Sequence, residues 1–122
     1  MKKILIVDDE QQNQETLTAG LMKNPDLVIL QAYTRQEAVK LFDENPDVAL
    51  IAMDACMPHP DASAFMRGRP NTQWLVAHMK KTFKGPIVAV SSAYNSYLME
   101  AGCTHKAEKQ DFPHLAAQFL GL

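Results

Sequence analysis

Residues 4–10 read ILIVDDE, an apolar run that ends abruptly in three acidic residues. The run is rich in β-branched residues and has no polar residue on either face, which is typical of a strand in a parallel sheet covered on both sides. Similar runs follow at residues 27–30, 48–53 and 87–90, and a weaker, polar one at 104–107 fits an edge strand. The sequence therefore predicts five strands.

Amphipathic stretches separate these runs and predict one helix after each strand. The second helix opens at residues 34–37 with the capping-box sequence TRQE. We expect Asn71 to cap the third helix and the fourth to cover residues 95–101, before a glycine. The methionines and Trp74, the only tryptophan, are interpreted as core or helix packing.

Five consecutive strand–helix units predict an α/β fold. Right-handed crossovers leave few arrangements, and the favoured one is a doubly wound (βα)5 flavodoxin-like three-layer sandwich with a parallel sheet in the order 2-1-3-4-5. The length of 122 residues is close to that of an average domain, so residues 1–122 are expected to form a single domain. Functional sites in such folds lie at the carboxyl ends of the strands.

Polar residues at these strand ends indicate phosphoryl chemistry. Asp8 and Asp9 follow the first strand, Asp54 the third, Ser91 the fourth, and Lys109 the fifth. Three close carboxylates repel one another unless a cation lies among them, and oxygen-only ligands suit Mg²⁺. A carboxylate could then act as the nucleophile, with the lysine and the serine contacting the transferred group.

Composition excludes several classes of protein. Twelve Lys and Arg residues against fourteen Asp and Glu give a net charge of −2, which argues against direct nucleic-acid binding by this domain. No apolar run is long enough to cross a membrane. The apolar run after the two N-terminal lysines resembles the start of a signal peptide, but the acidic residues after residue 7 end it before it reaches the length that a signal peptide needs. Cys56 and Cys103 are too few for a disulfide scaffold. We expect a cytoplasmic protein.

Several motifs together resemble the receiver domain of bacterial two-component response regulators, the CheY-like superfamily. They are ILIVDDE at 4–10, MDACMP at 53–58 with Asp61, PIVAVS at 86–91, and Lys109. The resemblance extends from Lys2 to about Leu120 and implies a phosphorylation switch with self-catalysed phosphoryl transfer, which is not an enzyme in the usual sense.

The resemblance also assigns roles to residues. Asp54 would accept a phosphoryl group from a histidine kinase or a phosphotransfer protein, Lys109 would contact that group, and Ser91 would move toward it. The implied Mg²⁺ ligands are Asp9, Asp54 and the backbone carbonyl of Cys56, with Asp8 acting mostly through water. Because Cys56 and Ala93 are poor at positioning water, we predict slow self-dephosphorylation.

The sequence departs from the family pattern at several positions. Ala62 replaces a usual glycine, the segment from Ser63 to Asn71 is lengthened, and Lys106 replaces the aromatic residue whose rotation reports phosphorylation. Gln110 replaces a proline that commonly follows a cis peptide bond. An alternative function is therefore a receiver-like interaction module that binds its partners independently of phosphorylation.

The expected effector surface comprises the fourth helix, the fifth strand and the fifth helix, with Tyr94, Tyr97, Lys106 and Phe112 on it. We expect a stand-alone receiver, although an output domain beyond the last residue stays open. Simpler interpretations also remain: the acids after the first strand could cap a helix, Ser91 could be a turn residue, and both cysteines could be inert.

Overall fold

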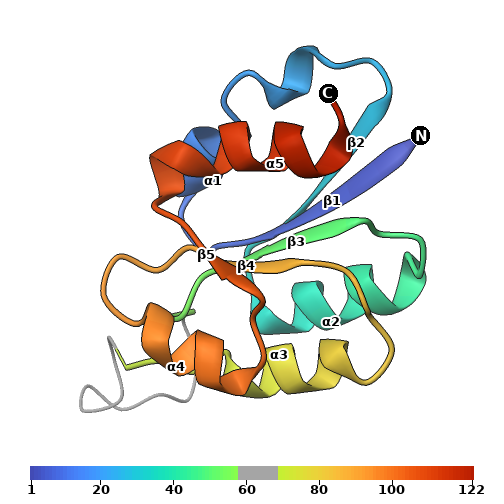
Figure 1. The fold of residues 1–122 in the computed structure, drawn as a ribbon. Coiled ribbons are helices and arrows are strands. Elements are labelled where there is room, and N and C mark those ends of the chain that lie inside the picture. The colour runs from blue at the N-terminus through green and yellow to red at the C-terminus, as the bar shows by residue number, and fades with distance from the viewer. Residues whose placement is uncertain (58–68) are drawn as a thin grey trace.

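The computed structural model describes residues 1–57 and 69–122, and these form a parallel sheet between two layers of helices (Figure 1). The sheet order is β2-β1-β3-β4-β5, which confirms the predicted flavodoxin-like topology. The strands are β1 (Lys2–Val7), β2 (Leu27–Ala32), β3 (Leu50–Met53), β4 (Ile87–Ala89) and β5 (His105–Lys106). The helices are α1 (Gln11–Thr18), α2 (Arg35–Glu44), α3 (Gln73–Lys80), α4 (Asn95–Ala101) and α5 (Phe112–Leu120), with 3-10 turns η1 (Leu21–Lys23) and η3 (Lys109–Asp111).

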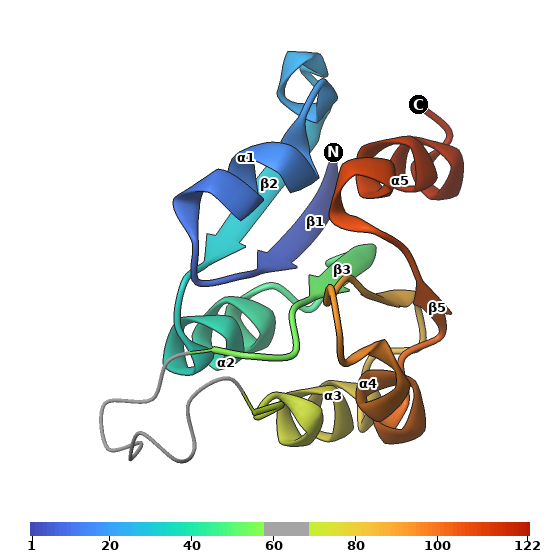
Figure 2. The same ribbon diagram turned by 90° about the vertical axis from the view of Figure 1, so that its left-hand side faces the viewer.

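The two faces of the sheet have separate cores. Leu5 and Val7 of β1 belong to the core beneath α2, α3 and α4, whereas Ile4 and Ile6 belong to the core beneath α1 and α5. Figure 2 shows these two groups of helices on opposite faces of the sheet. All four side chains are fully buried, because β1 lies in the middle of the sheet and successive side chains of a strand face opposite sides. The apolar run at residues 4–7 is thus covered on both sides, as predicted.

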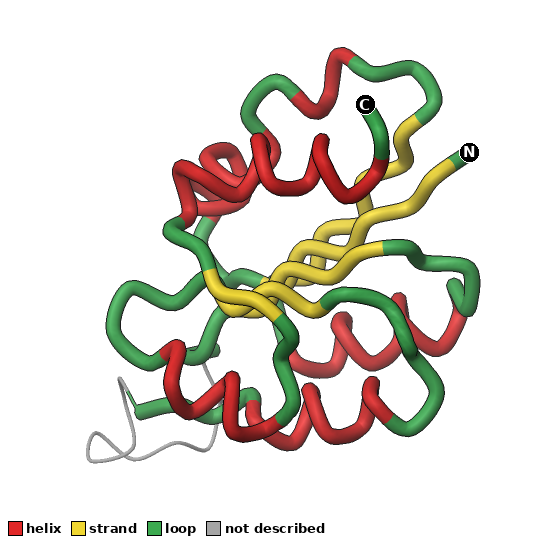
Figure 3. Tube along the Cα trace, viewed as in Figure 1, coloured by secondary structure: helices red, strands yellow, loops and turns green. Residues whose placement is uncertain are grey.

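All strand pairs are parallel, so the loops that follow the strands gather at the carboxyl ends of the strands, on the left in Figure 3. Strand β5 has only two residues, both exposed, and it lies at the edge of the sheet as its polar sequence predicted. Among the described residues, no helix has the length and apolar character needed to cross a bilayer.

Helix α2 begins as predicted. The Thr34 hydroxyl accepts a hydrogen bond from the Glu37 backbone N–H at 3.0 Å. The Glu37 carboxylate accepts from the backbone N–H of Tyr33 at 3.2 Å, one residue further back than in a standard capping box. These two bonds satisfy the backbone N–H groups of Glu37 and Tyr33.

Three predictions about side chains are wrong. Asn71 does not cap α3: Thr72 is the cap residue, and the Asn71 amide binds the backbone of Met57 instead. Trp74 is 48% exposed, because Leu75 and its neighbours take the buried face of α3. Phe112, expected on the effector surface, is fully buried, because α5 turns it toward the sheet.

The described peptide bonds include no cis bond, so Gln110 follows an ordinary trans bond. The expectations for Asp61, Ala62 and most of the lengthened segment concern residues 58–68, which lie outside the described ranges.

Candidate functional site

The carboxyl ends of β1 and β3 bring three acids together. Val7 and Met53 are register partners in the parallel pair, so the residues that follow them, Asp8 and Asp54, leave the sheet at the same level. The Asp54 backbone N–H donates to the Val7 carbonyl at 3.0 Å, which extends this pairing by one step. Carboxylate oxygens of Asp8, Asp9 and Asp54 lie within 4.8 Å of one another, close enough to share one cation.

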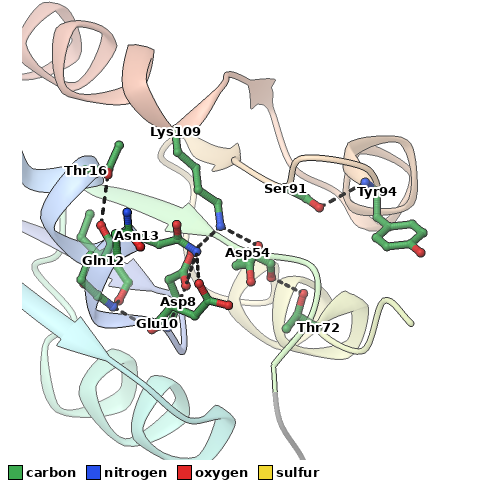
Figure 4. Close-up of polar contacts among 12 residues, drawn as sticks. Asp8, Glu10, Gln12, Asn13, Thr16, Asp54, Thr72, Ser91, Tyr94 and Lys109 are labelled. Carbon is green, nitrogen blue, oxygen red and sulfur yellow. Dashed lines mark hydrogen bonds and ion pairs between the residues drawn. The ribbon is translucent and has the colours of Figure 1, made fainter. Parts of the chain in front are cut away.

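Lys109 reaches this cluster from the other end of the chain. It opens η3, which begins after a two-residue connection from β5, and Figure 4 shows its side chain extending between Asp8 and Asp54. Its ammonium nitrogen Nζ lies 2.7 Å from Asp8 Oδ2 and 3.3 Å from Asp54 Oδ1. One ammonium thus faces three carboxylates, and the site keeps an excess of negative charge.

The surroundings of Asp54, Asp9 and Lys109 shift the pKa values of these three side chains. Burial raises the pKa of Asp54 to about 6, and the charge of Asp8 adds to this effect while Lys109 opposes it. The pKa of Asp9 is also raised, first by burial and then by the neighbouring acids. Burial alone lowers the pKa of Lys109, but the hydrogen bond that its ammonium donates to Asp8 and the charge of Asp54 bring this pKa above its ordinary value. A divalent cation with oxygen ligands would relieve the remaining repulsion.

Asp8 is held rigidly and is fully buried. Its Oδ1 accepts hydrogen bonds from the Glu10 backbone N–H at 3.0 Å and from Asn13 Nδ2 at 3.2 Å. The residue that precedes α1 as its cap is Glu10, and its side chain makes no capping hydrogen bond. The simpler interpretation of Asp8 and Asp9 as helix caps is therefore not what the structure shows.

Gln14, which sequence reasoning missed, fixes the backbone beneath the acids. Its side chain is fully buried, and its Nε2 donates to the carbonyl oxygens of Asp8, Ala32 and Ile6 at 2.9, 3.2 and 3.3 Å. The side chain thus ties the end of β1 to the end of β2. Its spacing of three residues before buried Leu17, on the inner face of a helix, was the available signal.

The segment between β3 and α3 fixes the backbone around Asp54. The Thr72 hydroxyl donates to the Asp54 carbonyl at 2.7 Å, and the Asn71 backbone N–H donates to the Ala55 carbonyl at 2.8 Å. The Asn71 side chain accepts from the Met57 N–H at 2.8 Å and donates to the carbonyl of the same residue. These bonds leave the Asp54 side chain free to face the other acids.

Ser91 lies at the end of β4 but has different partners from the acids. Its hydroxyl oxygen accepts from the backbone N–H groups of Ala93 at 3.3 Å and Tyr94 at 3.1 Å, the second of which is drawn in Figure 4. The Ser91 N–H donates to Asn95 Oδ1 at 2.8 Å. Within the described residues, no hydrogen bond joins Ser91 to Asp54 or Lys109, so in this state it acts as the turn residue of the simpler interpretation.

Cys56 follows Asp54 closely and is half-buried against the core beneath α2 to α4. Burial, and then the charge of Asp54, raise the pKa of its thiol, which keeps the sulfur protonated and unreactive. This agrees with the interpretation of Cys56 as packing.

Comparisons with known proteins address the fold. No model of a protein family matches the chain, and no curated protein matches its sequence. Solved structures do match. One is the complex of CheY6 with the P1 domain of CheA3 from R. sphaeroides, with a TM-score of 0.70 and 20% identity over 99% of this chain and 98% of that chain.

Two further matches come from other bacteria. A two-component response regulator from Clostridium difficile has a TM-score of 0.75 and 19% identity, covering 99% of this chain and 97% of that one. A response regulator protein from Burkholderia pseudomallei, solved with a phosphorylated aspartic acid, calcium ion and citrate, has a TM-score of 0.70 and 20% identity over 96% of this chain and 65% of that one. The chain therefore has the fold of response regulator receiver domains.

Proposed function

We propose that residues 1–122 form one receiver domain of a two-component pathway and that Asp54 is its phosphoacceptor. The observation that carries the proposal is the juxtaposition of Asp8, Asp9 and Asp54 within 4.8 Å, with Lys109 Nζ in contact with two of them. The fold alone does not require this set, because a doubly wound sheet accommodates many unrelated sites.

The proposed reaction transfers a phosphoryl group from a phosphohistidine. A carboxylate oxygen of Asp54 attacks phosphorus, the P–N bond breaks, and the released imidazole takes up a proton. The ammonium of Lys109 offsets the negative charge of the phosphoryl oxygens. Asp8, Asp9 and Asp54, with the carbonyl of Cys56, would hold Mg²⁺, which supplies charge neutralisation at those oxygens. The oxygen-only donor set and the excess of negative charge fit this ion.

The partners follow from the same proposal. A histidine kinase or a phosphotransfer protein would donate the phosphoryl group, as the pairing of CheY6 with the CheA3 P1 domain suggests by analogy. The output would be a change in the affinity of an effector for the surface formed by α4, β5 and α5, where Tyr97 is 49% exposed and Lys106 is exposed. The domain would act in the cytoplasm as a switch, without bound nucleic acid.

The alternative function, an interaction module that ignores phosphorylation, is favoured by two observations. The Ser91 hydroxyl is already engaged by backbone N–H groups, and exposed Lys106 occupies the position expected for the switching aromatic residue. The buried acid cluster argues against it, because unneutralised charge is unfavourable in a domain that has no use for it.

Acetyl phosphate, a small phosphoryl donor, distinguishes these two functions. We expect the intact mass of the chain to increase by one phosphoryl group in the presence of Mg²⁺ and to stay unchanged in EDTA. The Asp54→Asn variant, which keeps the shape of the side chain, is expected to show no increase. A wild-type chain that stays unmodified with Mg²⁺ would favour the phosphorylation-independent module.

A further inference from the structure

A groove of about 630 Å³ lies between α2 and α3. The two helices run side by side on the same face of the sheet in Figure 2. The residues that line the groove are Arg35, Gln36, Val39, Lys40 and Trp74. None of them belongs to the proposed phosphorylation site.

Trp74 and Arg35 lie against each other in the groove. The indole is 48% exposed, and the guanidinium carbon of Arg35 lies 5.8 Å from the centre of its ring. Arg35 Nη1 also donates to the Asn71 carbonyl at 3.3 Å, which uses one of the five N–H donors of a guanidinium. Arginine and tryptophan dominate the binding energy of protein interfaces, and here the two are already held against each other.

The groove has a positive charge in a chain whose net charge is −2. Arg35 and Lys40 line it, and none of its five lining residues is acidic. Two carboxylates of α2 have partners elsewhere: Glu37 accepts from the Tyr33 N–H at 3.2 Å, and Asp43 pairs with His78 at 3.2 Å. A complementary ligand would therefore be acidic.

We propose that this groove binds an acidic peptide segment of a partner protein. An apolar side chain of the segment would pack on Trp74, and its carboxylates would contact Arg35 and Lys40. A small-molecule ligand fits less well, because such sites enclose most of their ligand, whereas this groove is wide open to solvent. The proposal does not depend on phosphorylation of Asp54.

The chain carries its own reporter, since Trp74 is its only tryptophan. A random-peptide phage library is selected against the full chain, and enriched peptides are synthesised and titrated while tryptophan fluorescence is followed. We expect enriched sequences with Asp or Glu beside an apolar residue, and a saturable change in Trp74 fluorescence. Arg35→Gln and Lys40→Gln are each expected to weaken binding at least about fivefold. Lys84→Gln, an exposed control outside the groove, is expected to bind like the wild type.

Several results would overturn the proposal. They are a selection without enrichment, enriched peptides that lack acidic residues, or binding that leaves Trp74 fluorescence unchanged and is equally strong in Arg35→Gln. Saturable quenching by adenosine monophosphate, with no response to the peptides, would instead assign the groove to a small anion. Circular dichroism of each variant verifies that the fold is intact, so that a loss of binding reports on the groove.

Discussion

The Asn71 side chain binds both the backbone N–H and the carbonyl of Met57, with its Oδ1 2.8 Å from the Met57 nitrogen. The Asn71 backbone N–H also donates to the Ala55 carbonyl, so Asn71 holds the backbone of two residues that follow the proposed phosphoacceptor. The sequence context of Asn71 is typical of a helix cap, and this supporting role is a different one.

Replacing Asn71 with alanine should therefore affect both stability and phosphorylation. Loss of the two side-chain hydrogen bonds is expected to lower the free energy of unfolding by about 1–3 kcal/mol. Phosphorylation by acetyl phosphate should slow, because the backbone beside Asp54 loosens. Urea unfolding and the rate of mass increase measure the two effects. Asn24→Ala, at the opposite end of the sheet, is the matched control, and equal effects in both variants would contradict the role of Asn71.

Gln14 holds the backbone at Asp8, much as Asn71 holds the backbone that follows Asp54. Gln14→Met keeps the size of the side chain but removes the donor to three carbonyl oxygens. We expect a loss of about 1–3 kcal/mol in the free energy of unfolding and a weaker affinity for Mg²⁺. Isothermal titration with Mg²⁺ tests the second effect. A variant that is less stable but binds Mg²⁺ like the wild type would show that Gln14 serves the fold alone.

The raised pKa of Asp54 predicts a specific dependence of stability on pH. The folded protein retains the Asp54 proton up to about pH 6, whereas the unfolded chain loses it near the ordinary value of 3.8. Folded chains therefore bind more protons across this window, and the stability of the metal-free protein falls as the pH rises through it.

Asp54→Asn removes this penalty. In EDTA at neutral pH the variant should be more stable than the wild type by roughly 3 kcal/mol, and the difference should vanish at low pH. Adding Mg²⁺ should narrow the difference, because the cation stabilises the ionised wild-type site. Thermal or urea unfolding across the pH range measures this. A variant less stable than the wild type at neutral pH in EDTA would refute the electrostatic interpretation.

Lys109→Gln tests the opposite charge. Without the ammonium, three carboxylates face one another in a partly buried site. We therefore expect the free energy of unfolding in EDTA to fall by about 2 kcal/mol or more. Mg²⁺ should restore more stability to this variant than to the wild type. Lys81→Gln, an exposed substitution, is the control. Mg²⁺ that stabilises both proteins equally would mean that Lys109 and the metal act on different groups.

The fold and the acid cluster could be predicted from sequence for a simple reason. Apolar residues on both faces mark a covered parallel strand, and connection rules then leave few possible strand orders, of which 2-1-3-4-5 is favoured. Since Val7 and Met53 are register partners, the acids that follow them had to lie close together. Asp8, Asp54 and Lys109 lie together where this reasoning puts them, although their chemical roles remain predictions.

The supporting contacts could not be predicted, because they depend on which loop passes close to a side chain. Asn71 has a sequence context typical of a helix cap. Its side-chain amide instead accepts a hydrogen bond from the Met57 backbone N–H and donates one to the Met57 carbonyl. Trp74 is interpreted from the sequence as core or helix packing but is 48% exposed, because helical periodicity does not show whether another element covers a given face.

The most direct test of the account is the position of the phosphoryl group. The chain is phosphorylated with acetyl phosphate and Mg²⁺ and then treated with borohydride, which reduces an aspartyl phosphate to homoserine. Peptide mass spectrometry locates the modified residue. We predict homoserine at position 54 alone, absent from Asp54→Asn and from samples prepared in EDTA. Homoserine at Asp8 or Asp9, or at no position, would contradict the assignment of Asp54 as the phosphoacceptor.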